Sequence, residues 1–123
     1  MSERFVILHH TLPDGEHWDL MLERGAGLMT WQLFRDPMTP GPWPIEAGRI
    51  GEHRKAYLEY EGPVSGNRGN VTRVESGTYE LQAAGADRWT VELRGERLVG
   101  AFVLEFNAGR WVFREERADE STG

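Results

Sequence analysis

The second half of the chain alternates apolar and polar residues, and glycine interrupts this alternation at short intervals. In Arg88–Arg94, for example, Trp89, Val91 and Leu93 would share one face of an extended strand. No stretch of the chain repeats apolar residues with the period of an α-helix. The pattern predicts strands separated by glycine-containing turns at Val71–Ser76, Thr78–Gln82, Arg88–Arg94, Leu98–Phe106 and Arg110–Arg114. These strands imply a mostly β fold, a small antiparallel barrel or sandwich.

The first half of the chain begins with a predicted β-hairpin. Phe5–His10 and His17–Glu23 have the pattern of strands, and Pro13-Asp14-Gly15 between them is a turn sequence. Because side chains alternate along a strand, the second strand has an apolar face and a polar face. The apolar face would carry Trp18, Leu20 and Leu22, and the other face His17, Asp19, Met21 and Glu23.

Three of the four histidines of the chain lie in this hairpin. His17 and Asp19, two residues apart on one strand face, can bind one metal ion together. His9 and His10 face opposite sides of the first strand, so only one of them can supply a third ligand. The alternative interpretation is that these are surface histidines beside a hairpin loop.

Length and composition describe one small globular domain. The 123 residues are expected to form a single domain at 1–116 and a polar tail at 117–123 that frays. The net charge of −6 argues against a protein that coats nucleic acid through its overall field, although a site for one phosphate needs only local charge. The chain has no cysteine and no apolar run near the ~20 residues of a membrane span, which favours a cytoplasmic protein. Lys55 is the only lysine, and no nucleotidyl-transfer motif surrounds it.

Several motifs of the chain occur in the same order and at the same spacing in one known family. They are Phe5-Val6-Ile7, His10, His17-Trp18-Asp19-Leu20-Met21-Leu22-Glu23, the run Glu52–Gly62 with His53 and Tyr57, and Val91–Gly100. With these motifs the chain resembles the 3′-phosphoesterase domain of bacterial DNA ligase D, in a short, free-standing form. The resemblance covers nearly the whole chain. It implies a small closed antiparallel β-barrel with a metal and phosphate crater at one end.

The resemblance also implies roles for individual residues. His10, His17 and Asp19 match the metal ligands of the family, which uses manganese; zinc also fits this ligand set. His53 matches the histidine that contacts the transferring phosphate from the side opposite the metal. Tyr57 matches a tyrosine that donates a hydrogen bond to a phosphate oxygen.

The chain departs from the family pattern at two arginines that bind phosphate. The first is replaced by Met21, whose thioether cannot substitute for a bidentate cation. The second aligns near Ile45, and Arg49 is the closest basic residue. Candidates to replace the missing cations are Arg49, Arg54, Lys55, Arg68 and Arg73.

These observations support more than one function. The first is a metal-dependent phosphoesterase that trims the 3′ ends of DNA or RNA–DNA strands, with end-joining repair proteins as partners. The second is a catalytically weak or inactive module on the same barrel, which binds a nucleic-acid end or a protein partner; Met21 favours it. A third is an unrelated metal-binding barrel that acts on a small molecule, and the match at His53–Gly62 argues against it.

Overall fold

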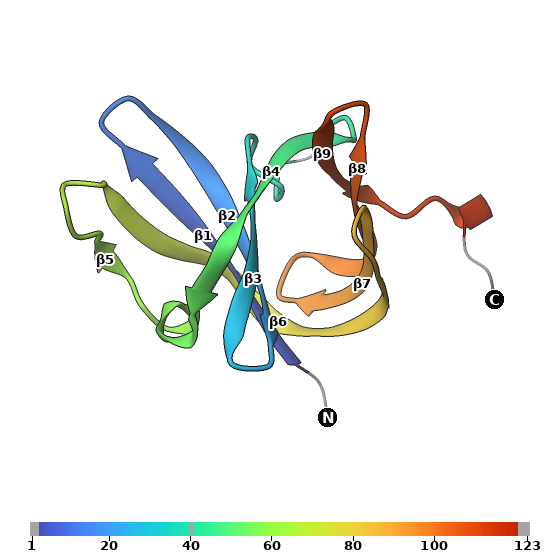
Figure 1. The fold of residues 1–123 in the computed structure, drawn as a ribbon, viewed down its shortest axis with the longest axis horizontal. Helices are drawn as coiled ribbons and strands as arrows, with labels where there is room; N and C mark the ends of the chain where they lie inside the picture. Colours follow the sequence, from blue (N-terminus) through green and yellow to red (C-terminus); the bar gives the residue numbers. More distant parts are fainter. Residues whose placement is uncertain (1–2, 40, 121–123) are drawn as a thin grey trace.

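The computed structural model describes residues 3–39 and 41–120, and most of them lie in antiparallel strands (Figure 1). Eight strands close into a barrel in the order β1-β2-β3-β4-β9-β8-β7-β6, with β6 paired back to β1 and the short β5 added beside β6. The strands of the ring are β1 (Glu3–Leu12), β2 (Gly15–Arg24), β3 (Gly27–Leu33), β4 (Ile45–Arg54), β6 (Asn70–Ala84), β7 (Arg88–Gly95), β8 (Val99–Asn107) and β9 (Arg110–Glu115). The other elements are η1 (Lys55–Leu58), β5 (Gly62–Pro63) and η2 (Ala118–Glu120). The predicted mostly β, closed antiparallel barrel is confirmed.

One prediction about the strands is wrong. Val71–Ser76 and Thr78–Gln82 are parts of one strand, β6, and Gly77 between them is not a turn. Gly77 pairs with Phe5 of β1 and with Gly95 of β7, so β6 passes from one half of the barrel to the other there. A Cβ on Gly77 would lie 2.1 Å from the carbonyl oxygen of Arg94, and only glycine, which has no Cβ, avoids this clash. The glycine therefore marks a close backbone approach, a use that alternation alone does not distinguish from a turn.

The barrel interior is filled by apolar side chains from every strand of the ring. They include Phe5, Ile7, Leu20, Leu22, Trp31, Leu33, Ile45, Ala47, Tyr79, Trp89, Val91, Leu93, Phe102, Leu104 and Phe113. On β2 the inward residues are Leu20 and Leu22, with Trp18 packed against the same core, as the alternation predicted. Each large side chain removed from water contributes ~1.5–3 kcal/mol, and together these residues fix the closed barrel.

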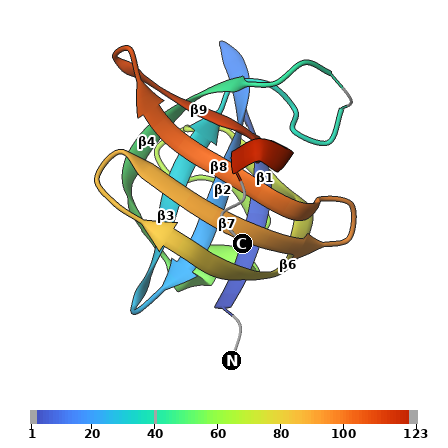
Figure 2. The ribbon, with the colours of Figure 1, turned by 90° about the vertical axis from the view of Figure 1, so that its right-hand side faces the viewer.

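A second apolar cluster lies on the outer face of the barrel wall. It consists of Val6, Leu8, Met21, Leu28, Leu58 and Val71, with Tyr57 and Val64 packed against it. The β1–β3 wall is therefore apolar on both faces, and η1 covers the outer one through the buried Leu58. In Figure 1, η1 (the green turn after β4) and β5 lie on the same side of the molecule as the β1–β2 hairpin. Figure 2 shows the molecule from the right-hand side of Figure 1, away from η1 and β5, and here β6–β9 cross in front of that wall.

Ion pairs of Glu120 tie the short η2 segment to the barrel. Glu120 in η2 forms a bidentate pair with Arg114 of β9, at 2.6 and 2.7 Å, and also pairs with Arg88. The Arg114 guanidinium holds the pKa of the Glu120 carboxyl well below its usual range. The expected division into a domain at 1–116 and a fraying tail at 117–123 stays a prediction, and 121–123 lie outside the described residues.

Candidate metal and phosphate site

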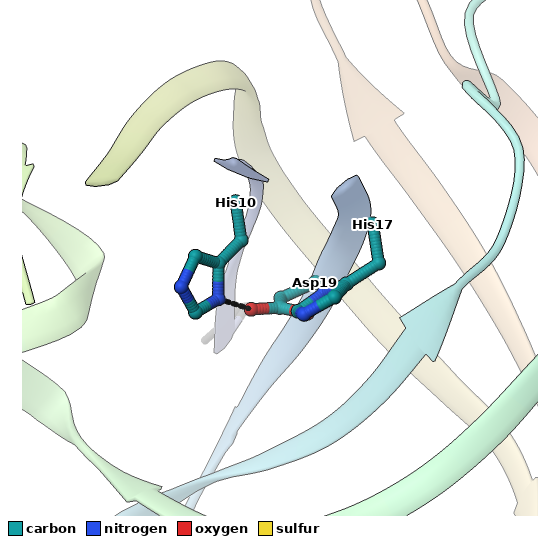
Figure 3. A group of neighbouring side chains, drawn as sticks. All are labelled: His10, His17 and Asp19. Atoms are coloured by element: carbon teal, nitrogen blue, oxygen red, sulfur yellow. Dashed lines mark hydrogen bonds and ion pairs between the residues drawn. The ribbon is translucent and has the colours of Figure 1, made fainter. Parts of the chain in front are cut away.

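Two neighbouring strands bring the three predicted metal ligands together. His10 on β1 lies directly opposite His17 on β2, and Asp19 follows two residues later on the same face of β2. Figure 3 shows the three side chains turned toward one another. Each residue offers one ligand atom, and these atoms all lie within 4.8 Å of one another. The backbone register of the hairpin is thus sufficient to assemble the group.

Hydrogen bonds orient the two imidazoles of this group. His17 Nδ1 lies 2.7 Å from Asp19 Oδ1, and His10 Nδ1 lies 3.6 Å from Asp19 Oδ2. On its other side, His10 Nε2 lies 2.6 Å from the carbonyl oxygen of Arg68. A carbonyl oxygen only accepts hydrogen bonds, so Nε2 carries the proton, and Nδ1 of the neutral ring keeps its lone pair. A backbone carbonyl on the far ring nitrogen is the usual arrangement of a metal-binding histidine.

The surroundings of Asp19 fit a divalent cation. Asp19 is only 4% exposed. Its nearest polar partners are the two imidazoles, and no arginine or lysine of the described chain forms an ion pair with it. A buried carboxylate needs a positive partner, because burial disfavours its charge. Two imidazole nitrogens and one carboxylate can supply that partner by holding a metal ion, with further coordination positions left open.

His9 does not belong to this group. Its ring stacks on Trp18 at 4.6 Å between centroids, on the other face of the hairpin, and its Nε2 lies 2.7 Å from Glu16 Oε1. Only His10 therefore faces His17, as strand alternation requires for one of the two neighbours.

A small pocket of about 150 Å³ adjoins the metal-ligand group. Its lining consists of Leu8, His10, Asp19, Met21, His53, Tyr57, Val64, Arg68 and Val71. The structure thus brings His53 and Tyr57, from the end of β4 and from η1, to the same cavity as His10 and Asp19. The apolar part of the lining belongs to the outer cluster, and none of it to the barrel interior. The cavity is therefore set against the outer wall and under η1, whereas the resemblance implied a crater at one end of the barrel.

His53 and Tyr57 are positioned by local backbone geometry. A shift of register between β3 and β4 places His53 opposite Leu28, on the outer face of the wall. His53 Nδ1 donates to the carbonyl oxygen of Gly51 at 3.0 Å, which leaves Nε2 for a ligand. The Tyr57 ring meets the His53 ring edge to face at 5.6 Å. The pocket thus contains an imidazole and a phenol beside the candidate metal ligands.

Met21 lies at the base of the pocket as part of the outer apolar cluster. It is 1% exposed and packs with Val6, Leu8 and Leu58. The arginine that the family pattern has at this position would therefore have to displace packed apolar contacts here.

Arg49 is not brought to the pocket. Its guanidinium carbon lies 4.9 Å from the ring centroid of Trp31, with Trp89 at 5.4 Å and Trp111 at 5.9 Å. Trp31 and Trp89 belong to the barrel core, so Arg49, although exposed, lies on the core-side face of β4, whereas His53 lies on the outer face. Arg49 therefore cannot replace the missing phosphate-binding arginine in this arrangement.

Two of the other candidate cations have partners elsewhere. Lys55 Nζ lies 3.3 Å from Glu23, whose carboxylate also accepts from the backbone and side chain of Arg4. The Arg4 backbone N–H is the main reason that the pKa of Glu23 lies below its usual value. Arg73 donates to the carbonyl oxygen of Leu58 at 3.1 Å and so holds the end of η1. Both cations therefore serve to fix η1 over the wall.

Arg68 is the one candidate cation in the lining of the pocket. Its carbonyl holds His10, and its guanidinium donates to the carbonyl and hydroxyl oxygens of Ser65 at 2.7 and 3.1 Å. Gly69, with a φ of +85°, lets this loop approach β1: a Cβ there would lie 1.9 Å from the carbonyl oxygen of Thr11. The sequence identified Arg68 only as one of several loop cations, and its carbonyl contact with His10 has no signature in the pattern.

The protein is thus a small closed β-barrel that carries a candidate metal-ligand group and an adjoining pocket on the outer face of its wall. The chain belongs to the family of the DNA ligase D 3′-phosphoesterase domain, whose family model matches residues 8–105. The matched region includes His17 and every residue that lines the pocket. A comparison with curated proteins found no match.

Among residues 3–39 and 41–120, no helix has the length and apolar character needed to cross a membrane.

Proposed function

We propose that the protein is a metal-dependent phosphoesterase that removes terminal groups from the 3′ ends of DNA or RNA–DNA strands. The observation that carries this proposal is the common pocket of His10, Asp19, His53 and Tyr57, in a chain of the 3′-phosphoesterase family. End healing before strand joining is the proposed role, with end-joining repair proteins as partners. The cysteine-free sequence is in keeping with action in the cytoplasm.

The metal is proposed to be held by His10, His17 and Asp19, and to be manganese, with zinc as the other ion that suits the ligand set. When bound, such an ion acts as a Lewis acid on a phosphate oxygen and as a source of activated water. Arg68 fixes the orientation of the His10 ring through its carbonyl oxygen, and His17 fixes the Asp19 carboxylate. These contacts align the ligand atoms before any ion arrives.

The pocket side chains account for the remaining needs of hydrolysis. A bond forms between phosphorus and a water oxygen, the bond to the strand's 3′ oxygen breaks, and the leaving oxygen takes a proton. Because His53 Nδ1 donates to Gly51, Nε2 carries a proton only in the imidazolium form, and in that form it is placed to stabilise the phosphate charge or to supply the proton to the leaving oxygen. Tyr57 is placed to donate a hydrogen bond to a phosphate oxygen. Arg68 is the proposed cation of the pocket, a weaker substitute for the arginine that Met21 replaces.

The experiment uses two substrates, a DNA primer–template ending in a 3′-phosphate and one ending in a single ribonucleotide. With Mn²⁺ the wild-type protein should give a dephosphorylated or shortened primer, and a chelator should stop the reaction. His53→Ala should lower the rate by at least ~100-fold, the lower end of what a positioned acid or base contributes. His9→Ala is the matched control and should retain the wild-type rate, because His9 lies on the other face of the hairpin.

The second candidate function is a binding module that retains the same pocket without turnover. The buried Met21 favours it, since the pocket lacks a bidentate cation at its base. If the wild-type protein with Mn²⁺ leaves both substrates intact but binds them, the binding module is the correct function and the phosphoesterase proposal is wrong.

A further inference from the structure

The pocket lined by His10, Asp19, His53 and Tyr57 is called the phosphate pocket below. A second pocket of about 250 Å³ adjoins it on the outer face of the barrel. Its lining consists of Arg54, Ala56, Tyr57, Tyr60, Pro63, Val64 and Ser65. Tyr57 and Val64 line both cavities, so the two are neighbours separated by these side chains. In Figure 1, η1 and β5, which contribute residues to this lining, both lie toward the left of the molecule. A ligand that enters the phosphate pocket thus has a second cavity beside it.

The walls of the second pocket have the chemistry of a nucleobase site. The rings of His53, Tyr57 and Tyr60 follow one another edge to face, at 5.6 and 5.8 Å between centroids. Tyr60 is 38% exposed, and its hydroxyl donates to the carbonyl oxygen of Pro63, which fixes the ring in an exposed position. Aromatic side chains that stay exposed and fixed are the surfaces on which proteins stack unpaired bases.

The charge of the lining agrees with a nucleotide as ligand. Arg54 lines the second pocket, and no aspartate or glutamate does. In the phosphate pocket the only carboxylate is Asp19, beside two histidines and Arg68. The linings of the two pockets together thus hold two arginines and one carboxylate, in a protein with a net charge of −6. Its size, below the ~300–1,000 Å³ of drug-sized sites, suits a single ring system.

We propose that the second pocket, with Arg54, Tyr57 and Tyr60 in its lining, binds the base of the nucleotide whose 3′-phosphate occupies the phosphate pocket. This inference rests on the proposed function, which places the phosphate there. A base that enters this pocket cannot be paired with a template at the same time. The preferred substrate is therefore a strand whose 3′-terminal nucleotide is unpaired, and a fully paired end is bound only after it opens.

The test measures equilibrium binding of a fluorescently labelled single-stranded DNA that ends in a 3′-phosphate. A second oligonucleotide is identical but lacks the base of its last nucleotide. Tyr60→Leu keeps an apolar side chain and removes the stacking ring, while Tyr60→Phe keeps the ring and removes the bond to Pro63. Phe106→Leu, which changes an exposed aromatic residue on β8, is the matched control. Thermal unfolding of each variant establishes that it is folded.

We expect Tyr60→Leu to weaken binding of the complete oligonucleotide about tenfold. This factor corresponds to the loss of one base–aromatic stacking contact, at the lower end of the range of such contacts. Binding of the base-free oligonucleotide should be unchanged, and Tyr60→Phe and Phe106→Leu should bind like the wild type. The wild type should also bind the single strand more tightly than a fully paired end. Equal affinity of wild type and Tyr60→Leu for the complete oligonucleotide would overturn the inference, as would an equal loss for both oligonucleotides.

The same preparations separate this inference from the proposed function. If His53→Ala abolishes hydrolysis while Tyr60→Leu has no base-dependent effect, the phosphoesterase stands and the base pocket is wrong. If no preparation hydrolyses the 3′-phosphate but Tyr60→Leu weakens binding only when the base is present, the base pocket stands as part of a binding module.

Discussion

At the scale of single residues, His9 and His10 are neighbours in the sequence with different surroundings. His10 faces Asp19 and has its far nitrogen on a backbone carbonyl, whereas His9 stacks on Trp18 and contacts Glu16. Strand alternation predicts that only one of the two can join the group, and family resemblance selects His10. Alternation placed Met21 on the polar face of β2 and did not predict that it is buried. It is buried because η1 covers part of this face of the strand.

The first prediction concerns Met21→Arg. In the presence of Mn²⁺ we expect hydrolysis of a 3′-phosphate to rise about tenfold, since a charge-assisted contact contributes ~1.5–3 kcal/mol and ~1.4 kcal/mol is tenfold in rate. Without substrate, the same variant should unfold at a lower temperature than the wild type, because a guanidinium replaces a packed apolar side chain. Met21→Leu is the control and should change neither property strongly. A folded Met21→Arg protein with unchanged activity would show that this position does not face the phosphate.

At the scale of elements, β6 joins the two halves of the barrel. It pairs with β1 along its first part and with β7 along its second, and Gly77 allows the close approach between them. Just before this glycine, the buried carboxylate of Glu75 accepts backbone N–H groups of Ser76, Glu96, Arg97 and Leu98 at 2.8–3.0 Å. The β7–β8 turn is thereby tied to β6 by one side chain, an anchor that no periodicity in the sequence reveals.

The second prediction concerns the pH dependence of stability through Glu75. Burial raises the pKa of this carboxyl, but the four backbone donors outweigh burial, and the net pKa lies below the usual 4.5. A depressed pKa in the folded state contributes stability that is present above the unfolded pKa and is lost as pH falls through the folded one. We expect the free energy of unfolding from urea titrations to decrease as pH falls below about 4.5.

Glu75→Gln provides the comparison for this prediction. It should lower the free energy of unfolding at pH 7 by ~1–3 kcal/mol, because buried N–H groups lose a charged acceptor. It should also flatten the pH dependence, whereas Glu59→Gln, at an exposed position, should leave both unchanged. A pH dependence of Glu75→Gln as steep as that of the wild type would assign the effect to other carboxylates.

At the scale of the whole molecule, alternation predicted an antiparallel barrel or sandwich, and the family resemblance predicted the closed barrel. Alternation also predicted that one of His9 and His10 meets His17 and Asp19, and the resemblance selected His10. Alternation placed His17, Asp19 and Met21 on the face of β2 opposite the core, but it did not predict the pocket that is formed against this face. The pocket depends on η1 and the Ser65–Gly69 loop, whose contacts with the wall join residues far apart in the chain. Alternation equally did not predict that Arg49 lies on the core-side face beside three indoles, because a shift of register between β3 and β4 reverses the faces along β4.

The most direct test of the central claim is the affinity for Mn²⁺, measured by calorimetry on the wild type and on two histidine variants. Loss of a residue that only orients a metal ligand costs ~10–100-fold in affinity, so loss of a ligand should cost at least about 100-fold. The claim predicts that the wild type binds one Mn²⁺, that His10→Ala loses at least this much affinity, and that His9→Ala binds like the wild type. Equal affinities for His9→Ala and His10→Ala, or no binding of Mn²⁺ or Zn²⁺ by the wild type, would contradict it.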